Sequence, residues 1–349
     1  MIIDKINNLI LKITYEDIKG CSFNYINNKL CSDIEDNIYK WSYITQTMIM
    51  TIKSLKPLKD KIGNSIDYRR FKEELDLWYY YKNGYNGSLI NIIDNNDLNY
   101  FNDIDDSIYT RILPIILSNT NWDIIKDEVI KNVLYTTGNI ETLLEAILLS
   151  KAIYLIMEGK ERDYEDIIKE IKEDVINLSQ IDFNNRYGNC YRINIAKYRG
   201  NYSIDFERKK ISLLNLLNGI HQQNYFPTLK ETLNIMKGNK KESEYKNLFI
   251  IGLTGLCENN SDYEFNGKLF INSLCKYIYK LRKGRIDPQN LRIEVGSSSD
   301  VFKFKESDSF KHPLLNDCLV LKRFKSQEHI ITYIKTKTGT YRFIKNIKK

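Results

Sequence analysis

The hydrophobic pattern of the chain changes near Gly284, and this change limits the possible folds more than any other feature. Before Gly284, apolar residues recur three or four positions apart, which places them on one face of a helix. After it, short apolar runs are separated by turn-forming residues, as in β-strands. We therefore expect a mainly α protein, with an all-helical body over residues 1–284 and a small, basic, β-rich module over residues 285–349.

Several segments of the body show the helical pattern clearly. Asp67 is placed to cap a helix, because a carboxylate there accepts hydrogen bonds from the first turn. The capping box Thr228–Glu231 predicts the start of a short helix. The segment Leu248–Leu256 is apolar on all sides, which predicts a buried helix with close packing at Gly252 and Gly255. The other predicted helices span 141–158 and 164–178.

The C-terminal module contains four strand-like runs. Ile330–Ile334 and Tyr341–Ile344 flank the turn-forming segment Lys337–Thr340, so these two runs are predicted to pair as a hairpin. The other two runs, Leu291–Val295 and Val301–Phe304, lie on either side of a stretch of glycine and serine. Together they predict a small sheet that follows the helical body.

Composition and cysteine usage are typical of a globular cytoplasmic protein. Of the 349 residues, 42% are hydrophobic and 28% are charged. The six cysteines include no Cys-x-x-Cys pair and no zinc-type cluster with histidine, which favours reduced thiols. The first residues include Asp4 and Lys5 and lack an export cleavage site. No run reaches the roughly 18 apolar residues of a membrane helix, so we expect no membrane association.

Positive charge is concentrated at the end of the chain. Residues 320–349 contain nine basic residues and one acidic residue, a net charge of +8, whereas the whole chain carries +7. Residues 1–319 are therefore almost neutral. A contact with nucleic acid through residues 320–349 is one interpretation of this charge, and a solvated basic tail is the other.

The segment Trp41–Met48 runs into an apolar helical stretch that ends near Leu55. It resembles the motif that opens the metal site of the ADP-ribosylglycohydrolase family, which reads roughly Trp/Tyr-Thr-Asp-Asp-Thr-Gln-Met. The two aspartates are absent here, since Tyr43 and Ile44 stand in their places. Magnesium is held by hard oxygen ligands, and neither a neutral phenol nor an aliphatic side chain replaces a carboxylate.

Other segments extend the resemblance over roughly residues 10–285. Asp105–Pro114 resembles an element that the family ends with Met-Arg-x-x-Pro, and it keeps Arg111 and Pro114. Tyr135–Ile140, with Thr137, precedes a long helix as a Thr-His pair does in the family, but it lacks the histidine. The apolar helix Leu248–Leu256 matches a glycine-containing helix of the family, without the Asp-x-Asp pair that precedes that helix.

The resemblance implies an ancestral hydrolase with two Mg²⁺ ions that activate water, and it implies that this chain has lost that site. We therefore expect no metal and no cofactor, and a pseudoenzyme that binds an unknown protein or an ADP-ribose-like ligand. The expected ligand-binding residues are Ser42, Thr45, Arg111 and Thr137.

An enzyme with rewired chemistry is the alternative. Asp105 and Asp106, near Asp103, are candidate catalytic carboxylates, and Glu145 on the following helix could join them. As structural residues, Asp105 or Asp106 would instead cap the helix that starts near Ser107. Arg111 also has one functional and one structural interpretation. It would contact a phosphate in the first and pair with a neighbouring carboxylate in the second.

Overall fold

The computed structural model describes residues 2–21, 41–158, 163–220, 225–238, 247–257, 263–291 and 300–347. Its helices are α1 (Ile2–Gly20), α3 (Tyr43–Ser54), α4 (Tyr68–Tyr81), α5 (Gly87–Ile93), α6 (Ile108–Arg111), α7 (Leu113–Ser118), α8 (Trp122–Thr136), α9 (Ile140–Met157), α10 (Tyr164–Ile176), α11 (Gln180–Tyr187), α12 (Tyr202–Leu217), α13 (Pro227–Met236), α14 (Leu248–Thr254) and α15 (Lys268–Arg282). Its strands are β1 (Leu55–Pro57), β2 (Asn64–Ile66), β3 (Ser309–His312), β4 (Asn316–Lys325), β5 (His329–Thr336) and β6 (Gly339–Asn346).

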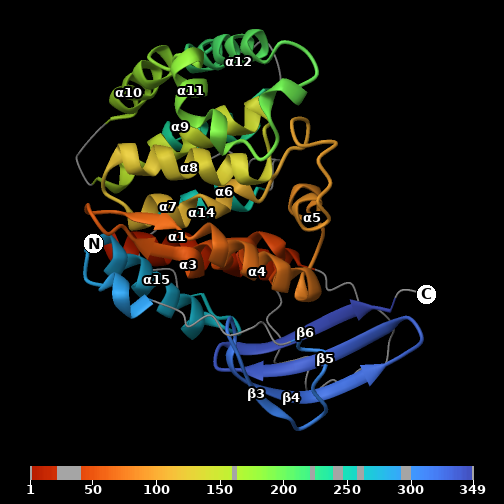
Figure 1. The fold of residues 1–349 in the computed structure, drawn as a ribbon. Helices are drawn as coiled ribbons and strands as arrows, with labels where there is room; N and C mark the ends of the chain where they lie inside the picture. Colours follow the sequence, from red (N-terminus) through yellow and green to blue (C-terminus); the bar gives the residue numbers. More distant parts are fainter. Residues whose placement is uncertain are drawn as a thin grey trace.

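The helices are stacked in layers, with the four-stranded sheet at one end (Figure 1). Helices α10, α11 and α12 form the opposite end, and α8 and α9 lie beneath them. The layer of α1, α3, α4 and α15 separates the remaining helices from the sheet. The expected fold class, a mainly α protein with a β-rich C-terminal module, is thus confirmed.

Most helices are preceded by an N-cap residue whose side chain accepts a hydrogen bond from an N–H group of the first turn. The first N–H groups of a helix have no partner within it, and a polar residue at the N-cap accepts from them. At α4, Asp67 accepts from the backbone N–H groups of Arg69 and Arg70, as predicted. At α9, Asn139 accepts from the N–H of Thr142. The same role is filled by Ser42, Asn86, Asn121, Asp163, Ser179, Asn201 and Asn247.

Helix α13 starts differently from its prediction. The capping box at Thr228–Glu231 is wrong, because the N-cap residue is Phe226 and its side chain makes no capping bond. Pro227 occupies the first turn, where its fixed φ suits a helix and its missing N–H leaves no donor unpaired. The Thr228 hydroxyl instead accepts a hydrogen bond from the Asn247 amide at 3.3 Å, which ties α13 to the start of α14.

Helix α9 is the centre of the hydrophobic core. It is buried on nearly every face and touches α7, α8, α10, α12 and α13. Its boundaries match the prediction of a helix over 141–158. None of the helices in the described ranges has the length and hydrophobicity needed to span a bilayer.

Helix α14 packs against α1 through Gly252 and through Gly255, the residue that follows its last turn, as the apolar sequence predicted. A Cβ atom on Gly252 would lie 2.4 Å from Cγ1 of Ile13, and one on Gly255 would lie 2.9 Å from the carbonyl oxygen of Asn8. No side chain fits at either position without displacing α1, so the glycines set the distance between the two helices.

Replacing Gly252 by alanine should therefore destabilise the protein. We expect the variant to lose about 1–3 kcal/mol relative to a matched Gly188→Ala control, because overpacking forces neighbours to shift. A Cβ on Gly188 would meet no atom within 4 Å, so the control reports the backbone effect of alanine alone. Urea unfolding of both variants measures the difference, and equal stabilities would show that α1 and α14 are not tightly packed.

The C-terminal sheet is an antiparallel meander in the order β3-β4-β5-β6. The hairpin predicted around Lys337–Thr340 is confirmed as β5 and β6, where Thr336 pairs with Gly339. The strand predicted at Val301–Phe304 is wrong, because these residues form a turn. The strand predicted at Leu291–Val295 lies, beyond Leu291, outside the described residues.

The sheet packs on the helical body through α4. Leu77, Tyr80 and Tyr81 of α4 contact a small core that includes Phe302 and Phe343. Val301 and Phe302 reach this core from their turn, which explains why an apolar run that is not a strand is nevertheless buried. The division into a body over 1–284 and a module over 285–349 stays a prediction.

Candidate functional site

The N-terminal end of α3 holds the first group of predicted site residues. The Ser42 hydroxyl accepts from the N–H of Ile44 at 3.2 Å, so it caps the helix. The N–H of Ser42 donates to Oδ2 of Asp17 on α1 at 2.8 Å. Burial raises the pKa of Asp17, and hydrogen bonding to Ser42 opposes that rise. Ser42 thus holds a buried carboxylate that the sequence did not single out, whereas the buried Thr45 hydroxyl has no hydrogen-bond partner.

Tyr43 ties the start of α3 to the loop before α6. Its phenol donates to Oδ2 of Asp106 at 2.6 Å. Burial and then this hydrogen bond raise the pKa of Tyr43 far above its usual value, so the phenol stays neutral. Its ring lies against Gly84, where a Cβ would come within 2.8 Å of the ring. Tyr43 occupies one of the two positions where the resembled motif has an aspartate. There, its phenol donates a hydrogen bond to a carboxylate from another segment.

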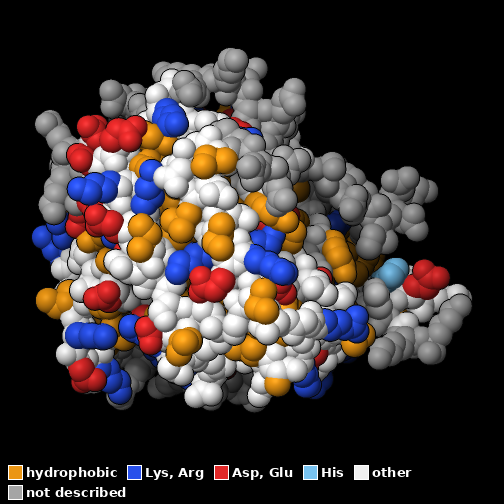
Figure 2. Space-filling view, turned by 90° about the horizontal axis from the view of Figure 1, so that it is seen from above, with side chains coloured by type: hydrophobic (Ala, Val, Ile, Leu, Met, Phe, Trp, Pro, Cys, Tyr) orange, Lys and Arg blue, Asp and Glu red, His pale blue; other side chains and the backbone are white. Residues whose placement is uncertain are grey.

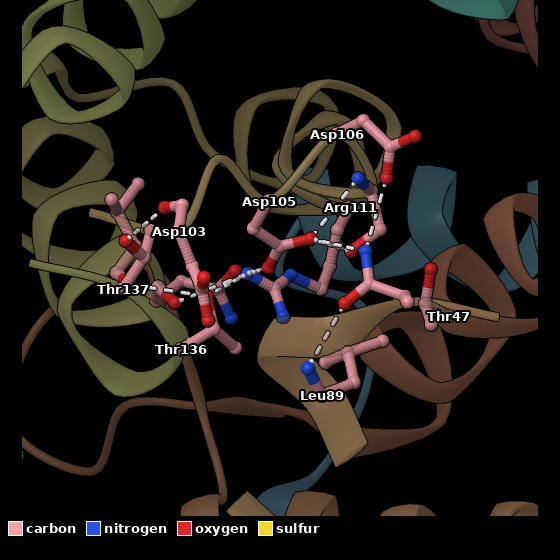
Figure 3. A network of polar contacts seen from close by, with 12 residues as sticks. Thr47, Leu89, Asp103, Asp105, Asp106, Arg111, Thr136 and Thr137 are labelled. Carbon is pink, nitrogen blue, oxygen red and sulfur yellow. Dashed lines mark hydrogen bonds and ion pairs between the residues drawn. The ribbon is translucent and has the colours of Figure 1, made fainter. Parts of the chain in front are cut away.

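Asp105 is fully buried and lies at the centre of a network of polar contacts (Figure 3). Its Oδ2 pairs with Nη2 of Arg111 at 3.1 Å, and neither side chain is exposed. Its Oδ1 accepts from the Asn86 amide at 2.9 Å and from the N–H and hydroxyl of Ser107 at 3.1 and 2.6 Å. The expected capping role of Asp105 or Asp106 is wrong, because the N-cap residue of α6 is Ser107 and no side chain makes a capping bond there. Asp105 instead accepts from Ser107 itself, just before the helix.

Arg111 joins this network to α8. Its Nη2 also donates to the hydroxyl of Thr136 at 2.8 Å and to the carbonyl of Asn132 at 3.4 Å. Nε and Nη1 are buried without a hydrogen-bond partner. Burial lowers the pKa of Arg111, and the charge of Asp105 opposes that shift. Pairing with a neighbouring carboxylate is confirmed, and ligand binding by Arg111 stays a prediction.

Thr137 and Asp103 fix the loop that carries these carboxylates. The Thr137 hydroxyl donates to the carbonyl oxygens of Asp103 at 2.7 Å and Tyr100 at 3.0 Å. The Asp103 carboxylate accepts from the Asn91 amide at 2.8 Å. Figure 3 shows Thr137 and Asp103 on the other side of Asp105 from Asp106. The Thr137 side chain is fully buried.

Glu145 belongs to a different cluster from the aspartates. Its two oxygens accept from the Tyr109 hydroxyl at 2.6 Å and from the N–H of Leu229 at 2.7 Å. Burial raises its pKa to about 7, and these hydrogen bonds oppose the rise. Within the described residues, no hydrogen bond or ion pair joins Glu145 to Asp105 or Asp106. The three candidate catalytic carboxylates are therefore divided between two clusters, and Asp106 is exposed whereas Asp105 and Glu145 are buried.

An open pocket of about 480 Å³ lies at the N-terminal end of α9, and Thr137 is not one of its lining residues. Aromatic and charged side chains share its walls. Glu141 pairs with Lys209 at 2.6 Å, and Asp205 pairs with Arg208 at 3.4 Å. Its lining comprises Phe101, Asn102, Asn139, Ile140, Glu141, Tyr198, Asp205, Arg208, Lys209, Ser212 and Tyr225. The sequence did not mark this pocket, because its walls come from four separated segments.

A metal ion is held by several side chains gathered at one place. In the part of the chain that the structure describes, no group of three or more His, Cys, Asp or Glu side chains is placed to hold one. The carboxylates near α3 are instead bonded to protein donors, namely Tyr43, Asn86 and Arg111. This arrangement can stabilise the packing of α3, α5, α6 and α8.

Comparison with known proteins assigns no family to the chain. No protein-family model matches it, and no curated protein sequence is similar to it.

Replacing Tyr43 by phenylalanine should remove one link of this network and keep its packing. We expect a loss of about 1 kcal/mol, since a hydrogen bond to a carboxylate is removed at a partly exposed position. Tyr85→Phe is the matched control, because the Tyr85 side chain is 70% exposed. Chemical denaturation compares the two, and an unchanged Tyr43→Phe stability would mean that the phenol does not hold Asp106 in solution.

Proposed function

We propose that this chain is a non-catalytic binding protein whose helical body is of the ADP-ribosylglycohydrolase type. The observation that carries the proposal is the hydrogen bond from Tyr43 to Asp106, next to the ion pair between Asp105 and Arg111. A divalent cation at these carboxylates would have to displace a phenol and lie beside a buried guanidinium, whose charge repels it. The carboxylates therefore support the fold.

The pocket at the N-terminal end of α9 is the binding site in this proposal. The rings of Phe101 and Tyr198 line the pocket and can contact a nucleobase, whereas one face of the Tyr225 ring is covered by Nζ of Lys209 at 3.4 Å. Glu141 and Asp205 can accept hydrogen bonds from sugar hydroxyls, and the Arg208 side chain is 75% exposed and able to contact a phosphate. A base, a ribose and a phosphate together make an ADP-ribose-like ligand the best chemical match.

Isothermal titration with ADP-ribose in metal-free buffer tests the proposal. We expect wild-type protein to bind, and Tyr198→Ala to bind about tenfold more weakly, since one stacked base contributes roughly 1–3 kcal/mol. Arg208→Ala removes a cation from an exposed side chain and should weaken binding without affecting the fold. Tyr85→Ala is the control. No heat with wild-type protein, or equal weakening in the control, would contradict the proposed site.

A hydrolase with rewired carboxylates is the second candidate, and Glu145 is the observation that favours it. A carboxyl group with a pKa of about 7 can donate or accept a proton near neutral pH. Its exposed fraction is only 1%, however, and it lines none of the described pockets. Release of ADP-ribose from a modified protein, abolished by Glu145→Gln, would establish this candidate in place of the first.

A further inference from the structure

Two adjoining pockets form a groove between the β1–β2 hairpin and α15. The first, of about 420 Å³, is lined by the hairpin and the end of α15, and the second, of about 450 Å³, continues along α15. They meet at Ile286, which lines both. The charged side chains along this groove are Lys59, Lys61, Arg282, Lys276, Lys280, Arg285 and Asp287, of which only Asp287 is acidic.

The cations of this groove are not neutralised by the protein. Five of them are exposed and form no ion pair in the described part of the chain: Lys59, Lys61, Lys276, Lys280 and Arg285. A row of uncompensated cations in a concave surface raises the local concentration of anions. The groove therefore carries an excess of positive charge although residues 1–319 are almost neutral overall.

Two other surfaces of the molecule differ from this groove in how their charges are paired. The end formed by α10, α11 and α12 shows acidic, basic and hydrophobic side chains side by side (Figure 2). In the C-terminal module, several basic residues already have structural roles. Lys345 pairs with Asp300 at 3.3 Å, and Arg323 donates to the carbonyl of Phe302 at 3.2 Å. The positive charge of residues 320–349 is thus partly used within the sheet.

The frame of the groove is held in place by buried contacts. Arg282 is nearly buried, and it donates to backbone carbonyls at the end of α7, among them those of Ile116 and Leu117. The Tyr277 hydroxyl donates to the carbonyl of Leu55 at 2.8 Å, which joins α15 to β1. Because such a surface is already ordered, binding to it does not carry the entropy cost of ordering its side chains and loops.

We propose that this groove binds single-stranded nucleic acid through its phosphate backbone. Its lining combines cations with the apolar side chains of Pro57, Leu58, Ile286 and Pro288. Each nucleotide of a single strand presents one phosphate and one exposed base face, and a lining of both kinds can contact both. A duplex hides its base faces by stacking, and the proposed ADP-ribose pocket shares no lining residue with this groove.

Fluorescence anisotropy with a labelled oligouridylate of about 20 nucleotides tests the proposal. The affinity of wild-type protein should fall steeply between about 50 and 200 mM salt, with a log–log slope near −3 for roughly four phosphate contacts. The groove variant Lys276→Glu/Lys280→Glu should bind at least about tenfold more weakly and show a shallower slope. The control variant Lys335→Glu/Lys337→Glu changes the net charge equally, in the β5–β6 hairpin.

The outcomes separate this site from its alternatives. A large loss in the groove variant with less than about a twofold change in the control supports the proposal. Equal losses in both variants would indicate a general charge effect, and a loss only in the control would move the site to the C-terminal module. Either result overturns the proposal, as does an absence of binding at low salt. Displacement of the strand by an equal charge of polyglutamate would indicate an acidic peptide as the natural occupant and would also overturn it.

Discussion

Replacing Arg111 by methionine is expected to destabilise the protein by about 3–5 kcal/mol, which is a large part of the stability of most domains. The reason is that Arg111 and Asp105 are both fully buried, and the substitution leaves the carboxylate without its partner charge. Methionine keeps most of the side-chain volume, so the loss reports the charge and its hydrogen bonds and not a cavity. Urea denaturation at pH 7 measures the change in unfolding free energy.

The double variant Arg111→Met/Asp105→Asn is the matched test of this explanation. Removing both charges should recover a substantial part of the lost stability, because no ion is then buried alone. Arg69→Met, at an exposed position, should change stability by less than about 0.5 kcal/mol. A double variant as unstable as Arg111→Met would show that the pair is not the source of the effect.

The second large effect is a dependence of stability on pH that arises from Glu145. In the folded protein its pKa is raised to about 7, against 4.5 for the free side chain. Below the lower value, both states bind the proton and the contribution to stability is fully present. As the pH rises towards 7 the unfolded state releases the proton first, so about 3 kcal/mol of stability should be lost. Denaturation curves between pH 4.5 and 8 measure this loss.

Glu145→Gln should abolish most of that slope, because glutamine does not titrate. The amide still offers one oxygen to the Tyr109 hydroxyl or to the N–H of Leu229, so the fold should survive. A Glu165→Gln control at an exposed position should keep the slope of the wild-type protein. Identical slopes in wild-type and Glu145→Gln protein would assign the pH dependence to other groups.

The sequence predicted those elements whose local signals agree with their tertiary contacts. Asp67 caps α4, and the glycines in and just after α14 pack against α1, because each feature depends on residues close together in the chain. Strand β4 was not predicted, since a bulge between Val320 and Lys322 shifts its register and interrupts the alternation of faces. The turn at Val301–Phe304 has the apolar sequence of a strand because the side chains of Val301 and Phe302 are buried in the small core.

The candidate site was predicted only in part, for a similar reason. The pairing of Arg111 with a nearby carboxylate was one of two interpretations, and a local motif was enough to suggest it. Asp17 and Asn86 were missed, because they lie 25 residues from Ser42 and 19 residues from Asp105. Asn86 did have a usable signal, since an asparagine before glycine and an apolar run is typical of an N-cap.

The most direct test of the central claim is the thermal midpoint of the protein with ADP-ribose, measured with and without millimolar Mg²⁺. We expect a rise of a few degrees at about 100 times Kd, where binding adds about 2.7 kcal/mol, and the same rise in both conditions. The rise should not depend on Mg²⁺ because Asp105 and Asp106 are held by Arg111 and Tyr43. A rise that requires Mg²⁺ would overturn the proposed function, since the carboxylates would then be metal ligands and not supports of the fold.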